Sequence, residues 1–202
     1  MKQLGFSESN AILKKYSLRL SEFRVIDSEK ELMQVEKRYR PYVLKAYTPD
    51  IVHKEKSGLV FHNINTPHEL IADYKILKSR IKGQKNAKIL LQKKMEGAEF
   101  IIGTKKDAIF GYAVLFGVGG VFTEQLNKAI LRIHPFSNKV AIEMVEKIAG
   151  NIINEQKIKK KIAELLVKVG KISEKEKIEE MDLNPVIVSK KWVHLVDVRI
   201  MK

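Results

Sequence analysis

The stretch Met181-Asp-Leu-Asn-Pro-Val-Ile-Val188 is followed by Ser189-Lys-Lys-Trp192 and Val193-His-Leu-Val-Asp197, and we expect the chain to fold around it. Two runs rich in β-branched residues joined by a short polar connection are typical of a β-hairpin. Alternation along a strand places Asp182 and Asn184 on one face, and Asp197 faces back towards them if the runs pair. Two carboxylates and an amide oxygen suit Mg²⁺ held with a bound phosphate. The same residues fit an edge hairpin with solvated acids equally well.

The composition is that of a folded protein with a sizeable core. The chain has 202 residues, of which 45% are hydrophobic and 31% are charged, enough for one domain or two small lobes. Cysteine is absent, which excludes disulfides, thiol catalysis and cysteine metal sites. The sequence shows neither an N-terminal apolar signal nor an apolar run near the ~20 residues of a membrane span. We therefore expect a cytoplasmic protein with no membrane partner.

The net charge of +14 raises the possibility of nucleic-acid binding. Only seven of the 38 basic residues are arginines, and the lysines are densest over 157–177, where they alternate with Glu and Ile. A solvated helix face explains that pattern more simply, and no basic motif with interleaved aromatic residues occurs. We expect no nucleic-acid partner.

The first part of the chain, residues 20–85, predicts a βαββα lobe. Expected strands are 24–27, 42–46 and 59–64. Expected helices begin at Ser28, which forms a capping-box pattern with Glu31, and at Thr66, and end near residues 38 and 81. A further short helix is expected at 8–16, and residues 1–19 are expected to pack on the second lobe.

The second lobe is expected to cover residues 86–202. Its expected strands are 88–95, 99–105 and 110–117, followed by a glycine loop at 117–120, a helix-like segment at 121–128 and a strand containing Arg132. Helices are expected at 137–148 and 155–172, before the final hairpin at 181–200. The order predicts an α+β fold of two lobes with a cleft between them, where small molecules often bind.

Two residues of the first lobe are candidates for phosphate chemistry. Lys45 ends a strand before the turn Thr48-Pro-Asp50, where its ammonium can hold a phosphate; an ordinary strand-end lysine fits as well. His53 follows in Asp50-Ile-Val-His-Lys54. A histidine ring nitrogen can accept a phosphoryl group, although a lone loop histidine more often has no such role.

Two features of the second lobe are further candidates. Phe116-Gly-Val-Gly-Gly120 follows a strand and precedes a helix-like run, and glycines there allow backbone amides to approach an anion. The sequence matches neither a dinucleotide fingerprint nor a Walker A motif. Glu99, in Glu-Phe-Ile-Ile-Gly103, is either an acid on the sheet surface or one in the cleft.

Taken in order, these motifs resemble one family. The series is Val43-Leu-Lys45, Thr48-Pro-Asp-Ile-Val-His-Lys54, Leu91-Gln92, Glu99-Phe-Ile-Ile-Gly103, Asp107-Ala-Ile-Phe-Gly111, Leu115-Phe-Gly-Val-Gly-Gly-Val-Phe-Thr-Glu124, Arg132, Asp182-Leu-Asn-Pro185 and Asp197-Val-Arg199. It is similar to the ATP-grasp β subunit, or β part, of the ADP-forming acetate/acyl-CoA synthetases, which are related to succinyl-CoA synthetase. The resemblance covers nearly the whole chain, is strongest at 41–61, 88–135 and 180–200, and implies one ATP-grasp domain over residues 1–202.

The resemblance implies an ATP-grasp fold that binds ATP or ADP with Mg²⁺. In this family acyl-CoA, ADP and phosphate give the acid, ATP and CoA. A CoA-binding α subunit forms the acyl phosphate, and phosphate then passes to a histidine of the β subunit and on to ADP. The chain is thus expected to be an acid–thiol ligase subunit active in a hetero-oligomer.

The resemblance also implies residue roles. Lys45 matches the nucleotide-phosphate lysine and His53 the relay histidine. Asn184 and Asp197 match the Mg²⁺ ligands, with Asp182 beside them. Other matches lie along the nucleotide site, namely Glu99, the glycines Gly117, Gly119 and Gly120, and Arg132.

The chain also departs from the family. Lys56, Lys93 and Lys128 replace acids, the Gly-Gly pair expected after His53-Lys54 is altered, and the segment after the 137–148 helix is shortened. These changes near a nucleotide site leave a second hypothesis open, a non-catalytic ATP-grasp subunit with a structural or regulatory role.

Overall fold

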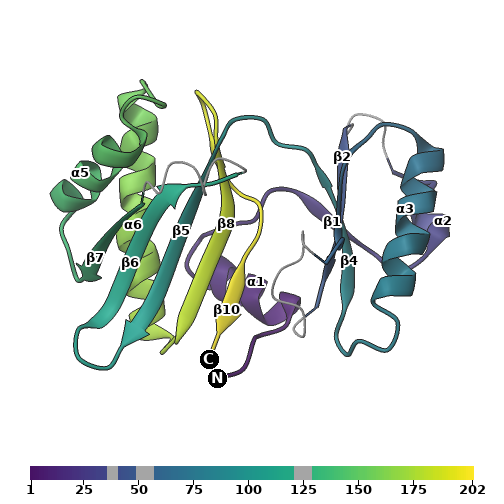
Figure 1. The fold of residues 1–202 in the computed structure, drawn as a ribbon, viewed down its shortest axis with the longest axis horizontal. Coiled ribbons are helices and arrows are strands. Elements are labelled where there is room, and N and C mark those ends of the chain that lie inside the picture. The colour runs from purple at the N-terminus through teal and green to yellow at the C-terminus, as the bar shows by residue number, and fades with distance from the viewer. Residues whose placement is uncertain (36–40, 49–56, 121–128) are drawn as a thin grey trace. The chain divides into compact units, whose positions relative to one another are not determined.

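The computed structural model describes residues 1–35, 41–48, 57–120 and 129–202, and these form two compact units (Figure 1). One unit consists of residues 5–11 and 21–95. The other consists of residues 1–4, 12–20 and 96–202. The predicted α+β class with two lobes is confirmed.

The unit of residues 5–11 and 21–95 contains a four-stranded sheet in the order β1-β4-β2-β3. Its strands are β1 (Phe23–Ile26), β2 (Tyr42–Tyr47), β3 (Val60–Ile64) and β4 (Lys88–Lys93). Helices α2 (Glu29–Leu32) and α3 (Pro67–Arg80) pack on one face, against a core that includes Leu44, Tyr74 and Leu77. We refer to it as the small-sheet unit.

The lobe boundary predicted at 85/86 is wrong, because β4 pairs with both β1 and β2 and so completes the small sheet. The division falls at Met95/Glu96 instead. Strand pairing joins segments distant in sequence, and the polar break at 82–86 is only a turn within the unit.

The large-sheet unit contains six strands in the order β10-β8-β5-β6-β7, with β9 also paired to β8. They are β5 (Ala98–Asp107), β6 (Gly111–Val118), β7 (Ala129–His134), β8 (Glu180–Val188), β9 (Val193–Leu195) and β10 (Arg199–Met201). The predicted hairpin is therefore three strands, because β8 is long enough to pair with β9 at one end and β10 at the other.

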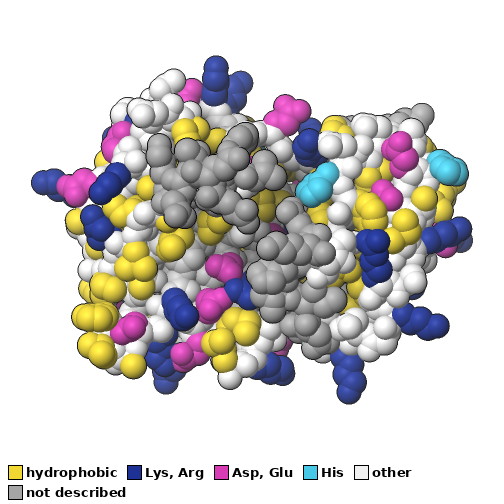
Figure 2. Space-filling model, in the orientation of Figure 1, with side chains coloured by type: hydrophobic (Ala, Val, Ile, Leu, Met, Phe, Trp, Pro, Cys, Tyr) yellow, Lys and Arg dark blue, Asp and Glu magenta, His cyan; other side chains and the backbone are white. Residues whose placement is uncertain are grey.

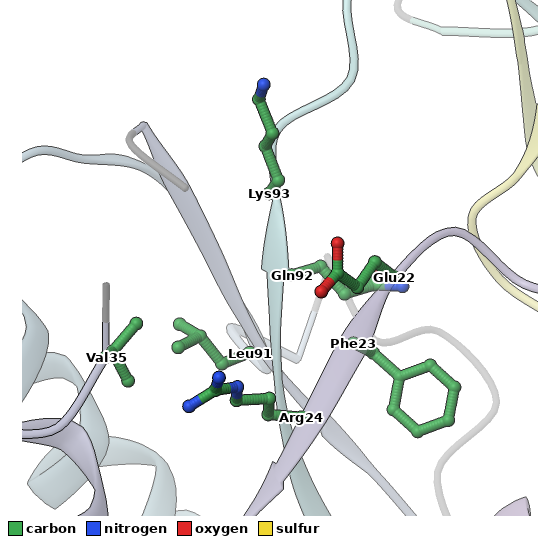
Figure 3. Close-up of a pocket in the computed structure, with 7 residues that line it drawn as sticks. All are labelled: Glu22, Phe23, Arg24, Val35, Leu91, Gln92 and Lys93. Atoms are coloured by element: carbon green, nitrogen blue, oxygen red, sulfur yellow. The ribbon is translucent and has the colours of Figure 1, made fainter. Parts of the chain in front are cut away.

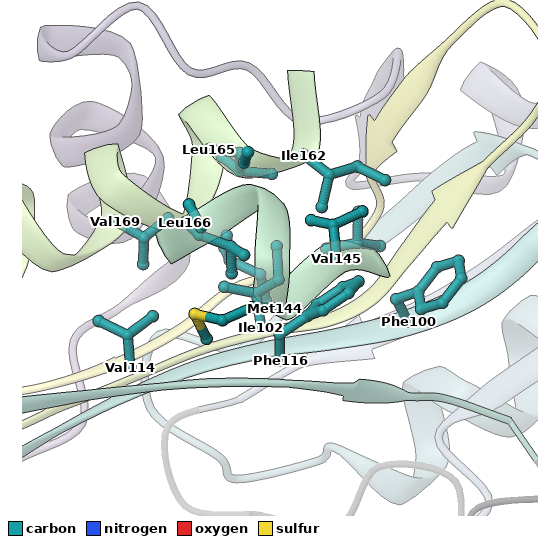
Figure 4. Packing of buried hydrophobic residues seen from close by; sticks show 14 of the residues in the cluster. Phe100, Ile102, Val114, Phe116, Met144, Val145, Ile162, Leu165, Leu166 and Val169 are labelled. Atoms are coloured by element: carbon teal, nitrogen blue, oxygen red, sulfur yellow. The ribbon is translucent and has the colours of Figure 1, made fainter. Parts of the chain in front are cut away.

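Helices α5 (Asn138–Ala149) and α6 (Gln156–Lys175) cover one face of the large sheet. Figure 4 shows Phe100, Phe116 and Met144 meeting side chains of α6 in this core. Phe100 and Phe116 stack with ring centroids 5.3 Å apart. This face is the covered face; the opposite face of the same sheet is the open face.

Helix α1 (Phe6–Lys15) contributes to both units, so the expectation that residues 1–19 pack on the second lobe holds only in part. Phe6 contacts Phe23 and Tyr47 of the small-sheet unit, whereas Leu13 belongs to the large-sheet core. The two ends of the helix therefore belong to different units, and the sequence alone does not show this division.

Two described helices, α3 and α5, begin at side-chain caps, whereas the N-cap residues of α2 and α6 make no such bond. Thr66 and Glu69 form the complete capping box of α3. Ser28 makes no side-chain cap to a backbone N–H; its hydroxyl donates to the Glu31 carboxylate at 2.9 Å, and α2 ends at Leu32 rather than near residue 38.

Among the described helices, none has the length and apolar character needed to cross a membrane.

Candidate functional site

A single cross-strand row organises the open face of the large sheet. The strand registers align Arg199 with Asp182, Asp182 with Gly103, Gly103 with Leu115, and Leu115 with Leu131. Residues opposed across antiparallel strands share a face. The row is charged on β10 and β8 and apolar on β6 and β7. Figure 2 shows charged side chains near the middle of this unit's visible face and hydrophobic ones towards its edge.

Asn184 and Asp197 fall opposite one another in the strand register, at a point where the sheet is irregular. On one side of this point β8 pairs with β9, with Val186 opposite Leu195, and on the other side it pairs with β10, with Asp182 opposite Arg199. The two pairings have the same register. Continuing that register between them places Asn184 opposite Asp197. Between them, the Val196 N–H donates to the Pro185 carbonyl at 3.2 Å. The register of β5 against β8 also shifts next to this point, so a bulge and a break between β9 and β10 coincide.

Burial shows that these side chains point to the open face. Leu183 and Val198 are buried in the core under α5 and α6. Because adjacent strand residues point to opposite faces, Asn184 of β8 faces the other way. Asp197, in the break between β9 and β10, directly precedes the buried Val198, and we place its side chain on the open face as well. One Asp197 oxygen, Oδ1, accepts the Val198 N–H at 2.9 Å, which fixes the orientation of the carboxylate.

Asp182 shares this face but is engaged by Arg199. The Arg199 Nη2 lies 2.7 Å from Asp182 Oδ2, and Nε donates to the same oxygen at 3.2 Å. Arg199 also forms an ion pair with Glu180. Asp182 is two residues from Asn184 along β8, and its Oδ2 oxygen is already bound by Arg199.

The donor set fits Mg²⁺ bound together with a phosphate. Asn184 and Asp197 offer an amide and a carboxylate oxygen, which are hard ligands. Within the ranges that the structure describes, no three His, Asp or Glu side chains gather as a metal cage. Mg²⁺ usually keeps several waters and takes one or two carboxylates plus substrate phosphates, and Asp197 can supply one such carboxylate.

Glu99 and the glycines lie against each other. The Gly119 N–H donates to the Glu99 carbonyl at 2.7 Å, and a Cβ on Gly119 would lie 3.2 Å from Glu99 backbone atoms. Gly120 has a φ of +81°, and its Cβ would lie 3.1 Å from the Glu99 carboxylate. A side chain at either glycine would crowd Glu99, and at Gly120 the positive φ also disfavours other residues. Gly117 lies within β6 rather than in a loop, and residues 121–128 are outside the described ranges.

The structure does not bring Arg132 together with the other predicted residues of the large sheet. Arg132 is opposite Val114, which is buried in the core of the covered face. Its side chain therefore starts from the covered face, where it is exposed and its Nη1 donates to the Leu131 carbonyl at 2.8 Å. The sequence of one strand predicts that its side chains alternate between two faces, but it does not show which face packs against the helices.

The predicted residues of the small-sheet unit have different outcomes. Lys45 lies in β2 with only 4% of its surface exposed. Its neighbours Leu44 and Ala46 belong to the core under α3, so Lys45 faces the opposite side of the small sheet. Lysine is rarely this buried, and a buried ammonium needs compensating interactions. His53 and Lys56 lie in residues 49–56, outside the described ranges.

A shallow pocket in the small-sheet unit lies at the edge formed by β1 and β4 (Figure 3). Leu91, Gln92 and Lys93 line it from β4, and Glu22, Phe23, Arg24 and Val35 complete it. None of the residues predicted to bind nucleotide or metal lines this pocket. The candidate site is therefore the open face of the large sheet, not this hollow.

Sequence reasoning missed the direct role of Arg199 and Gly103 in this arrangement. Gly103 leaves the position beside Asp182 without a side chain, and a Cβ there would lie 3.4 Å from Asp182 Oδ1. Both residues belong to runs that had been quoted, Glu99–Gly103 and Asp197–Arg199. Only the pairing of β10, β8 and β5 shows that they flank one carboxylate.

Comparison with known proteins defines the class. Residues 1–201 match the family model described as an ATP-grasp domain. The chain therefore belongs to the ATP-grasp family, and its two α+β units agree with that fold.

The relatives narrow the class further. The chain is 34% identical to the β subunit of ADP-forming acetate–CoA ligase II from Pyrococcus furiosus, over 96% of this chain and 89% of that subunit. It is 32% identical to ADP-forming acetate–CoA ligase II from Archaeoglobus fulgidus, of which it spans 29%. It thus belongs among the β subunits and β parts of the ADP-forming acetate–CoA ligases.

A solved structure gives the same result. Acetyl-coenzyme A synthetase 1 from Ca. Korarchaeum cryptofilum, in complex with coenzyme A and Mg-AMPPCP, matches with a TM-score of 0.77 and 30% identity, covering 99% of this chain and 92% of that one. In that structure the phosphohistidine segment points towards the nucleotide-binding site.

Proposed function

We propose that this chain binds ADP or ATP with Mg²⁺ on the open face of the large sheet and transfers a phosphoryl group between a phosphohistidine and ADP. It would do so as the nucleotide-binding subunit of an ADP-forming synthetase that acts on acetyl-CoA or a similar acyl-CoA. The observation that carries the proposal is the alignment of Asn184 with Asp197 at the break between β9 and β10.

Each residue has a distinct part in the proposal. Asn184 and Asp197 would hold the metal ion, which when bound supplies positive charge for the phosphate oxygens. Lys45, which matches the nucleotide-phosphate lysine of the family, would hold a nucleotide phosphate as a point charge. Glu99, by packing against Gly119 and Gly120, would fix the start of the glycine segment.

His53 is the proposed relay residue. In the direction of ATP synthesis, the N–P bond of phosphohistidine breaks as a β-phosphate oxygen of ADP forms the new P–O bond. The ring nitrogen that loses the phosphoryl group takes up one proton from solvent, so the products are ATP and a neutral imidazole, and no electrons are transferred. Splitting the overall transfer at histidine replaces one difficult step with two easier ones.

The proposed partner is a CoA-binding α subunit or an equivalent chain region, in a hetero-oligomer. Support comes from the relatives: one is named as a subunit β, and in another the matching region is 29% of a longer chain. The acyl substrate would be selected by that partner.

A labelling experiment tests the proposal. The purified chain, with and without its α partner, is incubated with Mg²⁺ and ATP labelled on the γ-phosphate. We expect an acid-labile, base-stable label in the wild type that is absent from His53→Asn and returns to ADP as ATP. His62→Asn, a change at a second histidine, serves as the matched control and should keep the label. Equal labelling of wild type and His53→Asn would contradict the relay assignment.

A non-catalytic subunit is the alternative, and Lys93 is the described residue that favours it. Lys93 ends β4 with an exposed ammonium where relatives of this type are expected to carry an acid. Lys128, like Lys56, lies outside the described residues. This alternative predicts assembly with the α partner but no labelled histidine under any of these conditions.

A further inference from the structure

Arg199 is a cation of the open face that directly contacts an acid next to the proposed metal ligands. It lies in β10 opposite Asp182, to which it donates through Nη2 at 2.7 Å and through Nε at 3.2 Å. Both bonds go to the same oxygen, Oδ2. The side chains of Arg199 and Asp182 are 21% and 35% exposed, so water screens this ion pair only in part.

Of the two residues opposite Asp182 on the neighbouring strands, Arg199 is the one that can bind its carboxylate. Across the sheet, Asp182 has Arg199 on one side and Gly103 on the other, and glycine offers no side chain. Lys105, also on the open face, is opposite Glu180 rather than Asp182. Arg199 is thus the cross-strand partner that can hold Asp182 in place.

The consequence concerns the charge that a metal ion would meet. Asp182 is two residues from Asn184 on the same face, so a carboxylate released from Arg199 would be a third oxygen ligand beside Asn184 and Asp197. Two carboxylates and an amide bind a divalent cation more tightly than one carboxylate and an amide, because affinity rises with the charge of the ligand set. The ion pair removes that second carboxylate from the set.

We propose that Arg199 is a positioning residue that holds Asp182 out of the metal coordination sphere, so that cation binding at Asn184 and Asp197 depends on the phosphates of the nucleotide. The inference rests on the proposed nucleotide function. It also assigns Asp182 a role different from that of a direct metal ligand: together with Arg199 it sets the charge beside the site.

The test is a double-mutant cycle read by cation binding rather than activity. The dissociation constant of Mn²⁺, used as a paramagnetic probe, is measured with and without ADP for the wild type, Arg199→Gln, Asp182→Asn and the double variant. The wild type should bind Mn²⁺ weakly without ADP. Arg199→Gln should tighten Mn²⁺ binding without ADP by at least about tenfold, because a carboxylate joins the ligands.

The double variant distinguishes positioning from a general change of charge. With Asp182→Asn also present, no carboxylate is released, and Mn²⁺ affinity without ADP should return to near the wild-type value. Lys105→Gln is the matched control, since it removes one positive charge from the same face without touching Asp182. It should leave Mn²⁺ affinity within about twofold, as expected for an exposed charge screened by salt.

Arg199→Lys keeps the inference testable if Arg199→Gln proves unstable. Lysine retains the charge but can donate only as a point cation, so its Mn²⁺ affinity should fall between those of the wild type and Arg199→Gln. Unchanged Mn²⁺ affinity in Arg199→Gln and Arg199→Lys, or equal tightening in the single and double variants, would overturn the inference while leaving nucleotide binding intact. A wild type that binds neither Mn²⁺ with ADP nor ADP itself would instead overturn the proposed function.

Discussion

The two faces of the large sheet are built from the same strands but have opposite chemistry. On β8, Met181 and Leu183 enter the core under α5 and α6, whereas Asp182 and Asn184, the alternate residues, lie on the open face. The covered face gains its stability from burial, and the open face keeps polar groups that burial would penalise. Alternate residues of one strand therefore serve different purposes: one set stabilises the core, and the other lies on the face that carries the proposed site.

The largest expected difference between the faces is in stability. Phe116→Ala should lower the free energy of unfolding by about 3–5 kcal/mol, because it removes a fully buried ring stacked on Phe100. Leu131→Ala, on the open face with its side chain 50% exposed, should cost less than about 1 kcal/mol. Urea denaturation of both variants measures the difference. Equal losses would show that the open face is covered in solution.

A polar pair within the covered face gives a sharper test. The hydroxyls of Thr104 and Ser173 are 2.6 Å apart and buried. Thr104→Val should cost about 1–3 kcal/mol, because the Ser173 hydroxyl loses its partner without reaching water. Adding Ser173→Ala should recover part of that loss in the same urea assay. Additive losses in the double variant would show that the hydroxyls do not act as a pair.

Glu176, directly after α6 in the large-sheet unit, should make the free energy of unfolding depend on pH. Glu176 accepts from Lys15 at 2.7 Å and from Tyr16 at 2.8 Å, with Lys202 at 3.4 Å, and these bonds lower the pKa of Glu176 to about 2. Since the pKa of an unfolded glutamate is about 4.3, the stabilisation is complete above that pH and disappears as the pH falls towards 2.

Glu176→Gln should therefore cost about 1–2 kcal/mol at pH 7 and much less near pH 2. Unfolding free energies of wild type and variant across this pH range provide the measurement. Glu164→Gln, which removes an exposed acid of α6, is the control. A difference between wild type and Glu176→Gln that stays constant with pH would contradict this account.

The sequence predicted what depends on local chemistry. The Thr66 capping box, the alternation in β8 and the helix that begins after Ser137 are each encoded within a few residues. Features that depend on pairing between distant strands were not predictable: β4 joins the small sheet, and β10 brings Arg199 to Asp182. Arg132 illustrates the same limit, because its strand alternates as expected but its face is set by the helices that pack on the sheet.

The central claim is that Asn184 and Asp197 form a metal–nucleotide site on the open face, and thermal unfolding with and without MgATP tests it most directly. Without ligand, Asp197→Ala should change stability by no more than about 1 kcal/mol, because the residue lies outside the core. With MgATP at about 100 times its dissociation constant, the wild type should gain roughly 2.7 kcal/mol and Asp197→Ala should gain none. A gain retained in Asp197→Ala, or no gain in the wild type with its α partner present, would contradict the claim.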